Sequence, residues 1–128
     1  DDQLGPRFPD MSEPYDAGLR RIAEQAAGRI KLQLRQGVFV WVTGPSYETA
    51  AEVKALHMLG GDSVSMSTVP EVIVARQRSL RVLGLSLITN LGTGLSAKPL
   101  SHEEVKLTAE ASAETLQKLI TEILNLIS

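Results

Sequence analysis

The chain has 128 residues, of which 43% are hydrophobic and 22% are charged, a composition that suits one compact domain with its own core. Its formal net charge is −2 and its basic residues are scattered, so nothing indicates binding to nucleic acid or to an anionic membrane. Cysteine is absent, which excludes disulfides, thiolate metal sites and a cysteine nucleophile. No apolar run approaches the roughly 20 residues needed to cross a bilayer. We therefore expect a cytoplasmic protein.

The first half of the chain predicts a helix, a strand and a second helix. Apolar residues recur at helical spacing over residues 14–35, and Ser12 or Glu13 is the expected start of that helix. Residues 38–42 form a continuous apolar run rich in β-branched and aromatic side chains, which is typical of a strand covered on both faces. Residues 49–59 favour a helix that ends at a pair of glycines.

The middle of the chain continues the alternation of strand and helix. A short strand is predicted at 63–66, a helix at 69–78 and a long apolar strand at 80–89. Such alternation argues for βαβ units and hence for an α/β fold.

The last helix is predicted over residues 101–127. Ser101 and Glu104 have the spacing of a capping box, in which each side chain bonds the backbone N–H of the other residue. The buried stripe of this helix is expected to comprise its regularly spaced apolar residues: Val105, Leu116, Leu119, Ile120, Ile123 and Ile127.

Isolated polar residues follow each of the three predicted strands. Tyr47 and Glu48 come after the first, Ser67 after the second, and Asn90 ends the third. Side chains at the ends of neighbouring strands in an α/β sheet converge on one crevice. The sequence therefore predicts a small-molecule site, as in an enzyme.

Each polar group also has a simpler interpretation. Glu48 is either a first-turn acid favoured by the helix dipole or a carboxylate that accepts N–H groups of a ligand. Asn90 is either a turn residue or an amide that offers a donor and an acceptor to a heterocycle. Ser67 either caps a helix or contributes to an anion site. His57 is interpreted as structural and His102 as a surface residue, and since neither lies at metal-ligand spacing we expect no metal.

Taken in order, the motifs become recognisable. They are G-P-S-Y-E-T-A-A-E from Gly44, M-S-T-V-P-E from Met66, S-L-I-T-N from Ser86 and S-H-E-E-V from Ser101. Together with G-P-R-F-P-D-M-S from Gly5, they resemble the trimeric purine nucleoside phosphorylases along essentially the whole chain. The resemblance implies a phosphorylase/hydrolase-like single domain with a mixed β-sheet flanked by helices. Residues 1–128 look like its C-terminal half, and the N-terminal half is expected to lie outside this chain.

The family resemblance also implies an activity. These enzymes carry out the reversible phosphorolysis of 6-oxopurine nucleosides (inosine and guanosine) to the free base and ribose 1-phosphate, in purine salvage. The resemblance implies phosphate as co-substrate, no cofactor, and a homotrimer whose active sites lie near the subunit contacts. Because much of the phosphate site of the family is missing from this chain, we expect the chain alone to be inactive and to need the N-terminal half as a partner.

Three residues match positions that carry the chemistry in this family. Glu48 looks like the carboxylate that holds the purine N1–H, and Asn90 like the amide at N7 and the 6-oxo group. His102 looks like the histidine near the ribose 5′-hydroxyl. A sister enzyme, methylthioadenosine phosphorylase, is the alternative, although it carries an aspartate in place of Asn90. A purine-binding fragment without catalysis is the second alternative.

The resemblance extends to residues around the substrate. Tyr47 matches an aromatic residue packed near base and sugar, Val64 a wall of the base pocket, and Met66 the residue under the ribose. Ser67 matches a hydroxyl that binds phosphate. Leu4 stands where many relatives have a phenylalanine that reaches into the sugar pocket of the neighbouring subunit.

Overall fold

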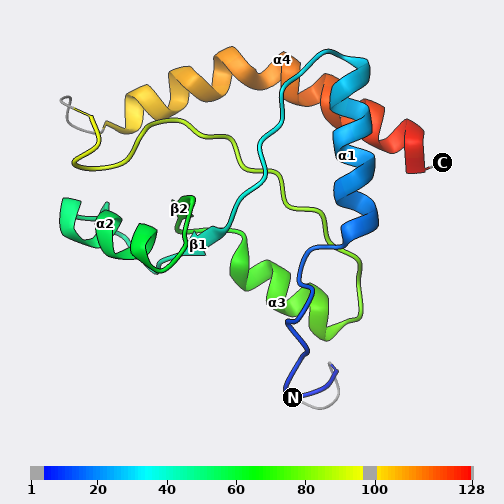
Figure 1. Cartoon of the computed structure of the whole chain (residues 1–128), viewed down its shortest axis with the longest axis horizontal. Helices are drawn as coiled ribbons and strands as arrows, with labels where there is room; N and C mark the ends of the chain where they lie inside the picture. Colours follow the sequence, from blue (N-terminus) through cyan, green and yellow to red (C-terminus); the bar gives the residue numbers. More distant parts are fainter. Residues whose placement is uncertain (1–4, 97–100, 128) are drawn as a thin grey trace. The chain divides into compact units, whose positions relative to one another are not determined.

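The computed structural model describes residues 5–96 and 101–127 (Figure 1). Within these ranges the element order is α1 (Ala17–Arg29), β1 (Phe39–Trp41), α2 (Ala50–Met58), β2 (Ser63–Ser65), α3 (Val69–Gln77) and α4 (His102–Ile127). This order confirms the expected α/β class. No helix in the described part of the chain is both long and apolar enough to pass through a bilayer.

The chain forms two compact units. Unit 1 comprises the chain up to Leu34, residues 67–85 and the chain from Gln117 onward. Unit 2 comprises Arg35–Met66 and Ser86–Leu116. The long helix α4 therefore contributes its first part to unit 2 and its last part to unit 1.

The core of unit 1 lies between α1 and the last part of α4, which cross each other in Figure 1. Ala23, Ala26 and Ala27 of α1 pack against Leu119 and Ile123 of α4, and all five side chains are buried. The alanines have little bulk beyond Cβ, so leucine and isoleucine can approach the α1 backbone closely.

The buried stripe of α4 is narrower than predicted. Leu119 and Ile123 are buried, whereas Leu116, Ile120 and Ile127 are 36%, 42% and 50% exposed. A helical repeat identifies an apolar face, but the width of the buried part depends on how much of that face the packing element covers. Here the α1 alanines cover one narrow strip.

The start of α1 differs from the prediction of Ser12 or Glu13. Asp16 is the N-cap, and its Oδ1 accepts a hydrogen bond from the backbone N–H of Leu19 at 2.8 Å. Arg81 donates from Nε and Nη2 to the same carboxylate at 2.6 and 2.8 Å. The helix therefore begins where a residue distant in sequence fixes the capping carboxylate, which local spacing does not reveal.

The end of α1 also comes earlier than the predicted residue 35. Lys31 has φ of 56°, in the left-handed region, and its N–H bonds the carbonyl of Gly28 at 3.2 Å. This left-handed residue stops the helical hydrogen-bond pattern after the C-cap Ile30.

In unit 2 the predicted strands β1 and β2 pair in parallel, with Val40 opposite Val64. Asp62 fixes the start of this pairing, because its Oδ2 accepts the N–H of Val38 at 2.7 Å and its own N–H donates to the Val38 carbonyl at 2.9 Å. The helix α2 connects the two strands (Figure 1). This is the βαβ unit that the sequence predicts.

A capping box opens α2. The Glu52 carboxylate accepts the Thr49 backbone N–H at 2.7 Å, and Thr49 Oγ1 accepts the Glu52 backbone N–H at 3.3 Å. At the predicted box of α4, Ser101 Oγ accepts the Glu104 backbone N–H at 3.1 Å. Sequence analysis overlooked the T-x-x-E spacing at residue 49, although it carries the same signal.

The predicted third strand at 80–89 is wrong for the described structure. The segment is extended, but the sheet formed by the described residues contains β1 and β2 alone. The Val82 carbonyl instead accepts the N–H of Asp16 at 2.9 Å, next to the α1 cap. An apolar β-branched run expresses a preference for extended backbone, whereas a strand also needs a neighbour for its ladder hydrogen bonds. The mixed sheet implied by the family resemblance is therefore not present in these residues.

Candidate functional site

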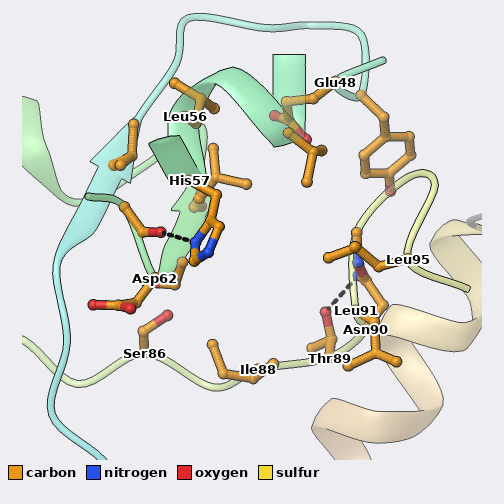
Figure 2. Close-up of a pocket in the computed structure, with 18 of the residues that line it drawn as sticks. Glu48, Leu56, His57, Asp62, Ser86, Ile88, Thr89, Asn90, Leu91 and Leu95 are labelled. Atoms are coloured by element: carbon orange, nitrogen blue, oxygen red, sulfur yellow. Dashed lines mark hydrogen bonds between the residues drawn. The ribbon is translucent and has the colours of Figure 1, made fainter. Parts of the chain in front are cut away.

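A pocket of about 370 Å³ lies within unit 2, which is in the size range of small-molecule sites. Its walls come from β1, β2, α2 and the segment 86–95. Figure 2 shows apolar side chains, among them Leu56, Ile88 and Leu95, together with a few polar ones. A largely apolar wall with isolated polar groups is typical of a site that orients a flat organic ligand.

The structure brings five of the predicted site residues together at this pocket: Tyr47, Glu48, Val64, Met66 and Asn90. Tyr47 and Glu48 follow β1, Met66 follows β2, and Asn90 comes after the extended apolar run. These four residues therefore lie just after the carboxyl ends of β1, of β2 and of the apolar run that ends at Asn90. The roles of the five side chains stay predictions.

Glu48 does not lie in the first turn of α2. Thr49 is the N-cap of that helix, and Glu52 is its first-turn acid. The interpretation of Glu48 as a first-turn acid favoured by the helix dipole is therefore wrong, because Glu52 of the capping box is the acid in the first turn. Among the described residues the half-buried Glu48 carboxylate has no hydrogen-bond or ion-pair partner. It can accept N–H groups of a ligand without breaking an internal bond.

Asn90 is held by local hydrogen bonds. Its Oδ1 accepts the backbone N–H of Gly92 at 2.9 Å, and its Nδ2 donates to Thr89 Oγ1 at 3.1 Å, the dashed bond in Figure 2. The turn interpretation is therefore right. It does not exclude the ligand interpretation, because the amide oxygen keeps a second lone pair and the amide nitrogen a second hydrogen.

Met66 packs against the turn that leads to Glu48. Gly44 in that turn has φ of +64°, which favours glycine, and a Cβ on Gly44 would collide with the Met66 side chain. Glycine at position 44 therefore leaves the space that the Met66 side chain occupies at the pocket wall.

The remaining predicted residues lie elsewhere. His102 is the exposed first residue of α4 and is not among the described residues that line the pocket. Ser67 belongs to unit 1, where its exposed hydroxyl lies 3.3 Å from Thr68 Oγ1. Thr68, and not Ser67, is the N-cap of α3, with φ of 78° and no capping bond from its side chain. Leu4 lies outside the described residues.

Several polar residues that line the pocket were given no site role from the sequence, among them His57, Asp62 and Ser86. In Figure 2 they occupy the opposite side of the pocket from Asn90. His57 Nδ1 lies 3.2 Å from the Gly61 carbonyl, and Asp62 holds the start of β1, so both residues support the turn between α2 and β2. In residues 5–96 and 101–127, no three His, Asp or Glu side chains gather as a metal site would require.

The sequence profile of the phosphorylase superfamily matches residues 1–125. The chain belongs to that superfamily. It is 53% identical over 110 residues to purine nucleoside phosphorylase 1 of Geobacillus stearothermophilus, a match that covers 86% of this chain and 40% of the relative. It is 48% identical over 120 residues to purine nucleoside phosphorylase 1 of Bacillus subtilis, covering 94% of this chain and 44% of the relative.

Solved structures agree with this assignment. The chain superposes on a Schistosoma purine nucleoside phosphorylase in complex with hypoxanthine with a TM-score of 0.91 at 40% identity, covering 95% of this chain and 45% of the other. The phosphorylase-like fold expected from the motifs is therefore confirmed. The chain spans between 40% and 45% of the length of these three relatives.

Proposed function

We propose that this chain is the base-binding part of a purine nucleoside phosphorylase, an enzyme of purine salvage that acts on inosine and guanosine. The observation that carries the proposal is the pocket, in which Glu48 and Asn90 follow different extended segments and retain hydrogen-bonding capacity. The 53% identity to a bacterial purine nucleoside phosphorylase supports it. The Schistosoma relative has hypoxanthine, a 6-oxopurine, in its complex.

Base recognition in the proposed site uses complementary donors and acceptors. The Glu48 carboxylate accepts the N1–H of a 6-oxopurine, while the Asn90 amide donates to O6 and accepts from N7–H. Tyr47 and Val64 supply flat and apolar contact to the ring, and both residues line the pocket. Met66, also at the wall, supports the ribose.

The reaction breaks the glycosidic C–N bond and forms a bond between the sugar carbon and a phosphate oxygen. In the transition state the sugar becomes cationic and the departing purine anionic, and a catalyst must bind this charge-separated state better than the substrate. Overall, the purine gains at N7 the proton that hydrogen phosphate loses, by way of solvent, and Asn90 Oδ1 accepts a hydrogen bond from that N7–H. Asn90 Nδ2 donates to O6, where negative charge develops on the departing base, in the manner of an oxyanion hole. Phosphate attacks the sugar directly, so the protein forms no covalent intermediate.

Two further roles are proposed from the family resemblance and not from the pocket. Ser67 offers its hydroxyl to phosphate, beside the N-terminus of α3, where backbone N–H groups favour an anion. His102 bonds the ribose 5′-hydroxyl. The reaction needs phosphate as co-substrate and no cofactor. We further propose a cytoplasmic homotrimer, with Leu4 at the sugar pocket of the neighbouring subunit.

The chain covers 40% of its Geobacillus relative, so the proposal requires a second part of the enzyme. The test measures hypoxanthine release from inosine and phosphate, by this chain alone and by this chain co-expressed with the remaining part of that relative. We expect release from the co-expressed pair and none from the chain alone. Turnover by the chain alone would contradict the need for a second part.

Two other outcomes identify the alternatives. Preference of the co-expressed pair for 5′-methylthioadenosine over inosine indicates a methylthioadenosine phosphorylase. Binding of hypoxanthine without turnover by any pair indicates a purine-binding module. The comparison variant is the same pair with Asn90→Ala, which lacks the amide and with it the hydrogen bonds to Thr89 and Gly92.

A further inference from the structure

The first turn of α2 contacts both segments that bring polar side chains to the pocket. Glu48 comes shortly before Ala50, the first residue of α2, and Asn90 comes shortly before Gly94. Gly94 lies so close to the helix that a Cβ on it would stand 2.6 Å from the Ala50 Cβ. The start of α2 therefore follows one pocket residue in the chain and supports the loop that follows the other.

Gly92 connects Asn90 to the same part of α2. Its backbone N–H donates to Asn90 Oδ1 at 2.9 Å, and a Cβ built on it would lie 3.8 Å from the Val53 side chain. Val53 is three positions after Ala50, so the two residues lie on one face of the helix. The loop that is bonded to the Asn90 amide thus contacts this face of α2 at two points.

The capping box keeps the first turn of α2 in place. The helix has only nine residues, and so short a helix depends on interactions at its ends. The Glu52 carboxylate accepts the Thr49 backbone N–H at 2.7 Å and the Thr49 hydroxyl at 2.8 Å. These two bonds lower the pKa of the Glu52 carboxyl, which is therefore ionised at neutral pH and acts as acceptor in both.

We propose that Thr49 and Glu52 are positioning residues, whose capping box sets the separation between Glu48 and Asn90 in the pocket. The inference rests on the proposed function, because it concerns the two side chains assigned there to the purine. A purine is rigid, so both side chains can bond it only at one separation, and holding them there in advance favours binding. Neither Thr49 nor Glu52 is among the described residues that line the pocket, so both act through the helix turn.

The experiment compares the wild-type chain with Glu52→Ala, which removes the capping carboxylate, and with Glu52→Gln, whose amide oxygen still accepts the Thr49 N–H. Hydrogen exchange of the unliganded chain, followed by NMR, reports on the Gly92 N–H. Calorimetric titration with hypoxanthine gives Kd. Circular dichroism checks folding, and Thr49→Val, which removes the hydroxyl alone, replaces Glu52→Ala if that variant does not fold.

The matched control is Ser101→Ala, which removes a capping bond from α4, where Ser101 Oγ accepts the Glu104 N–H at 3.1 Å. Ser101 and Glu104 belong to the same compact unit as α2, so the control lowers helix-end stability without changing the turn beside the loop.

We expect Glu52→Ala to speed exchange of the Gly92 N–H about five-fold, since the loop loses its support, and to raise Kd for hypoxanthine about ten-fold. Glu52→Gln should remain within about two-fold of the wild type in both measurements, because glutamine also forms a capping box. Ser101→Ala should leave both values unchanged. A purely local role of Glu52 would change exchange at the start of α2 and not at Gly92.

Three results would overturn the inference. Equal exchange of the Gly92 N–H in the wild type and in Glu52→Ala would show that the box does not hold the loop after Asn90. Equal Kd values would remove its role in base binding, and an equal loss of affinity in Ser101→Ala would assign the effect to general stability. Failure of the wild-type chain to bind hypoxanthine would contradict the proposed function, and the exchange comparison, made without ligand, distinguishes that failure from failure of the box to hold the loop.

Discussion

Glu48 and Asn90 differ in how the chain holds them, although both line the same pocket. Asn90 is bonded to Thr89 and Gly92, whereas no described residue pairs with the Glu48 carboxylate. A pre-oriented amide suits stabilisation of a developing charge, because no reorganisation is needed during the reaction. A carboxylate without an internal partner, such as that of Glu48, suits binding of an N–H group of the substrate before the reaction begins.

At the residue scale we predict that Asn90→Ala lowers kcat more than it raises KM for inosine in the co-expressed enzyme. The hydrogen bond from Asn90 Nδ2 to O6 strengthens as the purine becomes anionic, so its loss falls mainly on the transition state. The expected decrease in kcat is roughly 10²- to 10³-fold, as for removal of one oxyanion-hole donor. Steady-state kinetics of hypoxanthine release measure both constants.

His57→Ala is the matched control for this prediction, since His57 also lines the pocket but bonds the Gly61 carbonyl. We expect its kcat and KM to remain within about two-fold of wild type, with a loss of about 1 kcal/mol of stability from one hydrogen bond. A rise in KM for Asn90→Ala with unchanged kcat would refute the proposed role of Asn90.

At the scale of elements, the contact between Asp16 and Arg81 links the start of α1 to the extended segment after α3. Hydrogen bonds from Arg81 and from the Leu19 backbone hold the pKa of the Asp16 carboxyl well below its ordinary value. A folded-state pKa below the unfolded one stabilises the protein above the unfolded pKa of about 3.9. This contribution is lost as pH falls below that value and the carboxyl becomes protonated.

We therefore predict that Asp16→Asn makes the stability of the chain less dependent on pH between about 5 and 2. The wild-type Tm should fall over this range, and the Tm of the variant should start lower at pH 7 and fall less. Circular dichroism melts at several pH values measure both. Arg81→Met should give a slope between those of the wild type and Asp16→Asn, because the Leu19 N–H still holds the pKa of the Asp16 carboxyl below its ordinary value. A slope in Asp16→Asn equal to that of the wild type would contradict the role of this pair.

At the scale of the whole molecule, many large apolar side chains remain exposed. Four of them lie in the segment after Ser86: Leu87 at 41%, Ile88 at 59%, Leu91 at 68% and Leu95 at 66% exposure. All four also line the pocket of unit 2. Exposed apolar surface of this kind marks an interaction site or a tendency to aggregate. Under the proposed function, the remaining part of the enzyme covers it.

We predict that the chain alone binds the dye ANS and self-associates, and that co-expression with the remaining part of the Geobacillus relative reduces both. Burial of the apolar side chains in the shared interface is the physical reason. ANS fluorescence and sedimentation velocity measure the two effects at equal protein concentration. ANS binding that is as strong in the co-expressed pair as in the chain alone would contradict this prediction.

Much of the local structure could be predicted because its signals are local. The strand at 38–42 and the helix at 49–59 correspond to β1 and α2 with shifts of one residue at each end. The strand at 63–66 and the helix at 69–78 correspond equally well to β2 and α3. Apolar runs, glycine stops and a proline in a first turn act over a few neighbouring residues, so they can be read from the sequence directly.

Three features could not be predicted in the same way: the start of α1, the width of the buried stripe of α4, and the absence of a strand at 80–89 among the described residues. Asp16 caps α1 with the help of Arg81, which lies 65 residues away in the sequence. A strand at 80–89 would need a neighbour that no local pattern supplies. Each of these features depends on a contact between distant segments.

The sequence by itself determined the family, the order of elements and the residue types at the strand ends, because each of these depends on residue identity and short spacing. Only the tertiary structure decided that Glu48 and Asn90 line one pocket. The physical reason is that a hydrogen bond or a pocket wall joins atoms whose distance is set by folding. Sequence motifs identify the chemical groups, and the fold determines which of their hydrogen-bonding positions remain available to a ligand.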